Sequence, residues 1–188
     1  MHKYCFLKER SYCSAPLGKR ITLMIFSLAL VSFLAGFIVP ERVIIPVAGA
    51  GRADWNHHSF WHSPWGISGI HKGIDIFAAK GAPVISSTPG FVIYKGIFGL
   101  GGNVVAVIGP KWRIHYYAHL DKIDIRQWSF ARHGQKIGTV GTTGNAVGKP
   151  PHLHYAVVTP VPYVWRMGAG QQGWKKMFYL NPDELLRN

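Results

Sequence analysis

Cysteine is scarce in this chain, and both cysteines lie near its start. Cys5 and Cys13 precede a long apolar run, and no cysteine follows that run. The remainder of the chain therefore has no thiolate for a metal site and must fold without disulfide bonds. The absence of a cysteine after the apolar run also means that a bacterial lipoprotein is not indicated.

The apolar run is the one long hydrophobic segment of the sequence. Residues 21–39, ITLMIFSLALVSFLAGFIV, carry no charge and are long enough to cross a membrane as a helix. The preceding charges are mostly basic, which predicts a cytoplasmic segment 1–20, a transmembrane anchor 21–39 and an exported part 40–188. Those charges are Lys3, Lys8, Arg10, Lys19 and Arg20 against Glu9. The alternative is a cleaved signal and a secreted protein, because Ala48-Gly49-Ala50 has the small residues of a cleavage site.

Acidic residues are also few. The 188 residues contain 8 Asp and Glu against 21 Lys and Arg, which gives a formal net charge of +13. Such a surface attracts polyanions, and nucleic acid is the usual first candidate. Because an exported domain rarely meets nucleic acid, we expect an anionic partner of the cell envelope and no nucleic acid. The alternative is that the basic residues only keep the domain soluble.

Long helical periodicity, repeats and low-complexity stretches are absent between residues 46 and 160. That region instead contains short segments rich in Val, Ile and aromatic residues, bounded by Gly or Pro: APVISS, GFVIYKG, NVVAVIG and WRIHYYAHL. Their spacing of about ten residues predicts an antiparallel sheet or sandwich rather than alternating strands and helices. The glycine-rich stretch GIFGLGGN (96–103) lacks the GK[ST] ending of a phosphate loop, so we predict a hairpin turn.

Two short residue pairs about eighty positions apart suggest one metal site. His71 and Asp75 lie in HKGID, and His152 and His154 lie in PHLHY. Each pair has even spacing, so both of its side chains point to the same face of a strand. A hydrolytic zinc site uses three protein ligands and keeps one position open for water. With four candidate ligands for three positions, one histidine is left to act as general base or oxyanion partner. His119 in IHYYAHL is a second candidate for that role.

Four motifs occur in a recognisable order: HKGID, YYAHL, GQKIGTVGTTGNAVG and PHLHY. In these motifs, across about residues 47–158, the chain resembles the LytM or lysostaphin-type zinc endopeptidases, which cut peptidoglycan peptides. The resemblance implies a mainly β fold, a compact antiparallel domain with a groove over one zinc ion. It implies that His71, Asp75 and His154 bind this ion and that His119 and His152 assist catalysis. Together with the predicted anchor, a bacterial wall enzyme is expected in the inner membrane, with its domain facing the periplasm or cell exterior.

The sequence departs from the family pattern at one point. Many relatives continue the second histidine motif with a glutamate, whereas this chain has Tyr155 and Ala156. A missing carboxylate near the metal would alter ligand orientation or substrate choice but removes no ligand. The alternative function is a catalytically silent or gated module that binds the wall and regulates another hydrolase. Retention of all five expected residues favours the enzyme, and the sequence identifies no regulatory partner.

Three further features have more than one interpretation. GTTGNAVGKPP (141–151) leads directly into PHLH and is expected to form either a wall of the substrate groove or a plain surface turn. DWNHHSFWHSPWG (54–66) contains His57, His58 and His62 with three tryptophans. It is a candidate rim of the active site, a candidate second metal site or an aromatic corner of the core. His133, beside Gly134, is predicted to be solvated or structural.

Overall fold

The computed structural model describes residues 16–187, as one N-terminal helix and one β-rich unit. The basic residues at positions 3, 8 and 10 and both cysteines lie outside the described residues. The helix, α1, spans Leu17–Ile38 and has no buried side chain. Its mean hydropathy reaches 2.5, and 22 residues at about 1.5 Å each give about 33 Å. This length is sufficient for a hydrocarbon layer of about 30 Å.

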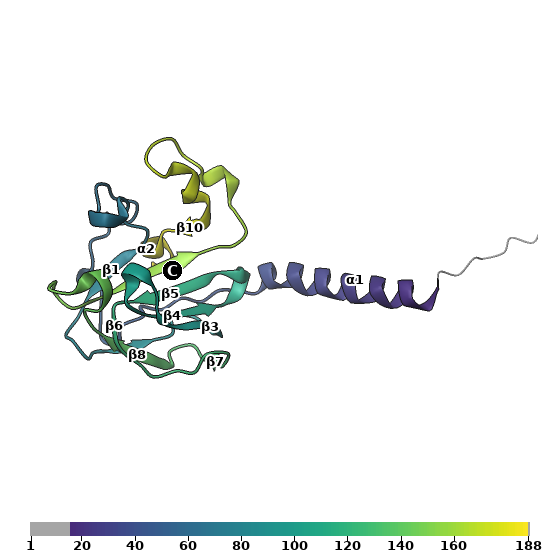
Figure 1. Cartoon of the computed structure of the whole chain (residues 1–188), viewed down its shortest axis with the longest axis horizontal. Helices are drawn as coiled ribbons and strands as arrows, with labels where there is room; N and C mark the ends of the chain where they lie inside the picture. The colour runs from purple at the N-terminus through teal and green to yellow at the C-terminus, as the bar shows by residue number, and fades with distance from the viewer. Residues whose placement is uncertain (1–15, 188) are drawn as a thin grey trace, which may run out of the picture. The chain divides into compact units, whose positions relative to one another are not determined.

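The β-rich unit, residues 37–188, contains ten strands, seven short 3-10 helices and one short α-helix among its described residues (Figure 1). The strands are β1 (Ile74–Phe77), β2 (Pro83–Ile85), β3 (Gly90–Ile97), β4 (Asn103–Ile108), β5 (Ile114–Ala118), β6 (Leu120–Ile123), β7 (Phe130–Ala131), β8 (Lys136–Val140), β9 (His152–Val158) and β10 (Tyr179–Leu180). The helix α2 covers Pro182–Leu185. The predicted mainly β fold, preceded by one apolar helix, is confirmed.

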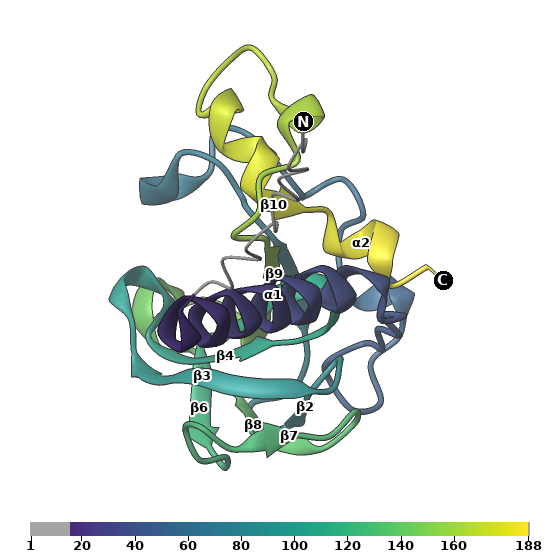
Figure 2. The same cartoon turned by 90° about the vertical axis from the view of Figure 1, so that its right-hand side faces the viewer.

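All strand pairs are antiparallel and form two sheets. The larger sheet has the order β1-β9-β5-β4-β3-β7, with β10 paired to the far end of β9. The smaller sheet has the order β2-β8-β6. Stretch 96–103 closes the β3–β4 hairpin, as predicted. In Figures 1 and 2 the C-terminal segment 160–178 lies above the larger sheet, on the side away from β8.

The core is built from alternate residues of the strands. On β9, Leu153, Tyr155 and Val157 are fully buried, which leaves the intervening side chains on the opposite face of the sheet. The buried side chains pack with residues from both sheets, among them Val84, Val107, Tyr117, Leu120 and Ile137. Because each strand buries one face, the alternation also determines which side chains remain available for a site.

A buried ion pair attaches the segment that follows α1 to the larger sheet. The carboxylate of Glu41 contacts the guanidinium of Arg113 and lies 3.0 Å from Nε2 of His115. Nδ1 of His115 lies 2.6 Å from the hydroxyl of Tyr155. Burial alone would raise the pKa of Glu41, but the hydrogen bond from His115 and the charges of His115 and Arg113 lower it below 4.5. Residues just after the helix are therefore part of the folded domain.

Glu41→Gln should lower the free energy of unfolding by about 3 kcal/mol at pH 7, because Arg113 and His115 remain buried without a carboxylate. The pKa of Glu41 is lower in the folded than in the unfolded chain. Its stabilisation is therefore full above about pH 4.5 and is lost as the pH falls below that value. Denaturant unfolding at several pH values measures both effects.

Glu184→Gln provides the control, since this carboxylate is exposed and its side-chain partner among residues 16–187 is Asn181. It should change stability by less than about 0.5 kcal/mol. Equal, small effects of the two substitutions would show that the Glu41 ion pair does not stabilise the domain.

Candidate active site

Pairing between β1 and β9 brings the two predicted ligand pairs together. Asp75 on β1 lies directly opposite His154 on β9, and Phe77 lies opposite His152. Directly opposed residues of an antiparallel pair have Cβ atoms about 4.5–5.5 Å apart. One strand register therefore positions a carboxylate and an imidazole side by side on the face that the core leaves free.

Glycine in the HKGID motif permits this approach. A Cβ atom at Gly73 would lie 2.4 Å from the carbonyl oxygen of Tyr155 and 2.9 Å from the ring of His154. Any larger residue would push β1 away from β9 or displace the imidazole. Because Gly73 lies between His71 and β1, the chain can bring His71 against the same ring.

Three side-chain atoms converge on one point. Nε2 of His71 is 3.0 Å from Oδ1 of Asp75 and 3.2 Å from Nδ1 of His154. The third distance, from Nδ1 of His154 to Oδ1 of Asp75, is 2.8 Å. Ligands at about 2.0–2.1 Å in a tetrahedron around zinc are about 3.3 Å apart. The three atoms are thus arranged as metal ligands require, and they form the one such cluster among the described residues.

The orientation of His71 is determined by its other ring nitrogen and by a tryptophan. Nδ1 lies 3.0 Å from the carbonyl oxygen of Ser59, which can only accept a hydrogen bond, so Nδ1 carries the proton. Nε2 is therefore unprotonated and directed at Asp75 and His154. The indole of Trp65 stacks on the imidazole, with ring centroids 4.0 Å apart and an interplanar angle of 17°. Such contacts fix the tautomer and the rotamer of a metal ligand.

His119 and His152 lie beside this cluster. A backbone carbonyl orients each of their rings, as the Ser59 carbonyl orients His71. Nδ1 of His119 donates to the carbonyl oxygen of Thr143 at 2.8 Å, and Nδ1 of His152 donates to that of Pro150 at 2.7 Å. Each ring thus keeps an unprotonated Nε2, and that of His152 is 3.9 Å from Oδ2 of Asp75. The rings of His119 and His152 meet edge to face, with their centroids 5.0 Å apart.

His119 has a left-handed backbone conformation, with φ of 65°. Its backbone N–H donates to the carbonyl oxygen of Gly101, which lies in the turn between β3 and β4. That turn packs closely on the 141–151 loop, and glycine is needed at the contact. A Cβ atom at Gly102 would lie 2.3 Å from the backbone nitrogen of Gly144. Non-glycine residues adopt this conformation rarely, and they do so where surrounding contacts require it.

The electrostatics of the site favour an ionised Asp75 and a neutral His119. Burial alone would raise the pKa of Asp75, but the adjacent imidazoles of His154 and His71 hold it well below its usual range. Burial is the largest cause that lowers the pKa of His119 to about 4, followed by charge on His154 and His152. Burial and the charge of Lys175 lower the pKa of Lys72.

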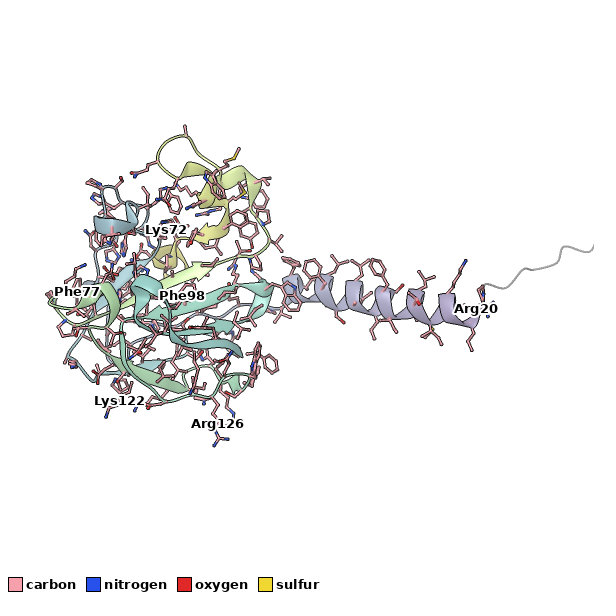
Figure 3. All side chains as sticks on the ribbon, viewed as in Figure 1. Arg20, Lys72, Phe77, Phe98, Lys122 and Arg126 are labelled. Atoms are coloured by element: carbon pink, nitrogen blue, oxygen red, sulfur yellow. The ribbon has the colours of Figure 1, made fainter. Side chains whose placement is uncertain are left out.

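A groove of about 340 Å³ lies over the cluster. All five predicted site residues line it, together with Trp65, Tyr116 and residues of the 98–101 turn. Asn145 and Lys149 also line it, so the 141–151 loop contributes a wall of the groove, one of the two expected possibilities. Figure 3 labels Phe98, which lines the groove from the turn after β3, and Phe77 on β1.

The two ends of the histidine-rich segment 54–66 have different roles. Nδ1 of His57 lies 2.6 Å from Oδ1 of Asp183, a fully buried carboxylate that also accepts from Trp55 and Arg187. This end of the segment is a structural corner, while Trp65 at its other end lines the groove. His133 is exposed in a turn, as predicted. Trp65 thus belongs to the candidate rim that the sequence suggested, whereas the Ser59 carbonyl that orients His71 was not predicted.

Comparison with known proteins assigns the family. The antiparallel fold and the His-Asp-His cluster beneath a groove define a metallopeptidase architecture. The chain belongs to peptidase family M23, whose model matches residues 69–164. The predicted family resemblance is therefore confirmed.

Similar proteins include peptidoglycan enzymes. The chain is 38% identical over 115 residues to the L-Ala--D-Glu endopeptidase of Bacillus subtilis (strain 168), covering 56% of this chain and 35% of that protein. It is 41% identical over 86 residues to the DD-carboxypeptidase/endopeptidase Mpg of Neisseria meningitidis serogroup B (strain ATCC 13091 / M2091), covering 46% and 19%. The crystallised catalytic domain of lysostaphin from Staphylococcus simulans aligns with a TM-score of 0.57 and 25% identity, covering 70% of this chain and 90% of that one. The chain spans about a third or less of the two curated relatives.

Gly73→Ala should weaken zinc binding by about tenfold or more, because the added methyl group meets the Tyr155 carbonyl and the His154 ring. Competition with a chelating dye measures the affinity. Gly51→Ala is the matched control, since a Cβ atom there meets nothing within 4 Å. Equal zinc affinity in both variants would contradict the role assigned to the close approach at Gly73.

Proposed function

We propose that this chain is a membrane-anchored zinc endopeptidase that hydrolyses peptide bonds in the stems or cross-links of peptidoglycan. The observation that carries the proposal is the convergence of His71, Asp75 and His154 beneath a groove that His119 and His152 also line. Family M23 membership and the names of the peptidoglycan relatives support the substrate class. The basic composition suits a substrate that carries carboxylates.

The donor set suits one zinc ion per chain. Two imidazole nitrogens and one carboxylate oxygen are typical ligands of catalytic zinc, and three protein ligands leave a position for water or substrate. Asp75 stays ionised and His71 presents an unprotonated Nε2, so neither must lose a proton to bind the ion. When bound, zinc polarises the scissile carbonyl and lowers the pKa of the attacking water.

His119 and His152 move the proton. Each presents an unprotonated Nε2, because the Nδ1 proton of each is held by a backbone carbonyl. Such a nitrogen accepts a proton from the attacking water and, as imidazolium, returns it to the nitrogen of the leaving amine. The imidazolium N–H also stabilises the developing oxyanion. The low pKa of His119 keeps this ring neutral at neutral pH.

The attachment of residues 41–47 supports a retained anchor over cleavage at Ala48-Gly49-Ala50. Glu41 is paired with Arg113 and His115, and Val47 is 2% exposed in the core. Backbone hydrogen bonds also join Ile44 to Ser87 and Pro46 to Ile85. Cleavage after residue 50 would remove these groups and leave the buried Arg113 guanidinium without its carboxylate. The helix α1 meets the length and hydropathy of a membrane span.

The full-length protein in detergent should release soluble muropeptides from purified sacculi. His154→Ala should lose both the zinc and the release, whereas His152→Ala should keep one zinc per chain and slow release by about a hundredfold or more. Metal analysis and product masses provide the readouts. His133→Ala, an exposed histidine outside the groove, should match the unmodified protein. Absence of release from zinc-loaded protein would instead favour the silent or gated regulatory module.

The protein isolated from cells should be in the membrane fraction, with the intact mass of an uncleaved chain. Ala48→Leu/Ala50→Leu removes the small residues of the cleavage motif and should leave the mass and the fraction unchanged. A soluble form that begins near residue 51 and is absent from this variant would contradict the anchor.

A further inference from the structure

We propose that Lys72 and Lys149 form a subsite that binds a peptide carboxylate next to the scissile bond. The subsite names a substrate feature for the proposed endopeptidase and therefore rests on that function. It predicts preference for stem-peptide bonds flanked by a free carboxylate over the same bonds flanked by an amide.

The two lysines approach the groove from different parts of the chain. Lys72 directly follows the ligand His71, and Lys149 lies in the loop that leads into β9 and His152. Both line the groove above the metal cluster. Lys72 is half-buried, so its position is more restricted than that of an ordinary surface lysine. Figure 3 labels it in the upper half of the domain, whereas Lys122 and Arg126 lie at the lower edge.

Neither lysine has an acidic partner among residues 16–187. The seven acidic residues there have other partners: Glu41 with Arg113 and His115, Asp54 with the Gly51 N–H, Asp75 with His71 and His154, Asp121 with Lys80, Asp124 with Lys136, Asp183 with His57 and Arg187, and Glu184 with Asn181. Asp75 is the one acid among them that lines the groove, and it is enclosed by the histidines. The two cations in the groove wall therefore have no counter-ion from the described chain.

A substrate carboxylate supplies that missing charge. Two unpaired cations in a concave site with apolar walls attract an anion more strongly than the same charges on an open surface. The groove also contains Trp65, Phe98, Leu100 and Tyr116, which suit the apolar parts of a peptide rather than a polyphosphate. The B. subtilis relative is named for a bond next to glutamate, a residue that carries such a carboxylate.

The test compares one muropeptide in two forms, with its carboxylates free and with them converted to amides. Full-length protein in detergent should show a kcat/KM about tenfold higher for the free form. In Lys72→Met/Lys149→Met the ratio of kcat/KM between the free and amidated forms should fall close to one, mainly because KM for the free form rises. Lys80→Met/Lys122→Met removes the same charge outside the groove and should keep the ratio. Calorimetric binding of both forms should show the same pattern in Kd.

The outcomes separate the subsite from the proposed function. The subsite alone is overturned if the protein hydrolyses sacculi but has similar kcat/KM for the free and amidated forms. It is also overturned if the Lys72/Lys149 variant keeps the preference for the free form. Failure to hydrolyse sacculi overturns the endopeptidase, and the calorimetric comparison of the two ligands then decides whether the lysines recognise a carboxylate. A ratio lost equally in the Lys80/Lys122 variant would show a general charge effect and also overturn the subsite.

Discussion

The site depends on the antiparallel register between β1 and β9. That register places Asp75 opposite His154 and, two positions on, Phe77 opposite His152. A shift of β9 by one residue would turn His152 and His154 into the core and bring Tyr155 to the groove, because successive residues of a strand face opposite sides. The fully buried Leu153, Tyr155 and Val157 prevent that shift, so the hydrophobic core and the His-Asp-His cluster require the same register. Gly73 completes the arrangement by allowing the strands to approach closely.

Backbone carbonyls then determine the chemistry of the imidazoles. Ser59, Thr143 and Pro150 each accept the Nδ1 proton of one histidine and leave its Nε2 unprotonated. These carbonyl acceptors do not titrate, so each keeps the Nδ1 of its histidine as the hydrogen-bond donor. One consequence is that the surrounding loops matter as much as the ligands, since a small displacement of a loop would rotate a ring. The stacked Trp65 and the interlocked glycine loops restrict such displacement.

Much of the fold and site was predictable because it depends on local periodicity. Even spacing within HKGID and PHLHY predicted two same-face pairs, and strand composition predicted an antiparallel domain, which the structure has. The conformation of His119 was not predictable, because it depends on the 98–101 turn and the 141–151 loop packing together. The Glu41 ion pair was missed for a similar reason: its partners lie more than seventy residues away, and a single glutamate after an apolar run carries no local pattern. The functional roles of the five site residues stay predictions.

Anomalous diffraction at the zinc edge, from crystals of the zinc-loaded protein, tests the central claim most directly. The account predicts one strong peak about 2.0–2.2 Å from Nε2 of His71, an oxygen of Asp75 and Nδ1 of His154, with the Nδ1 atoms of His119 and His152 still on their backbone carbonyls. A peak bound instead by the His57–His62 segment, or one that includes His119 or His152 as a ligand, would contradict it.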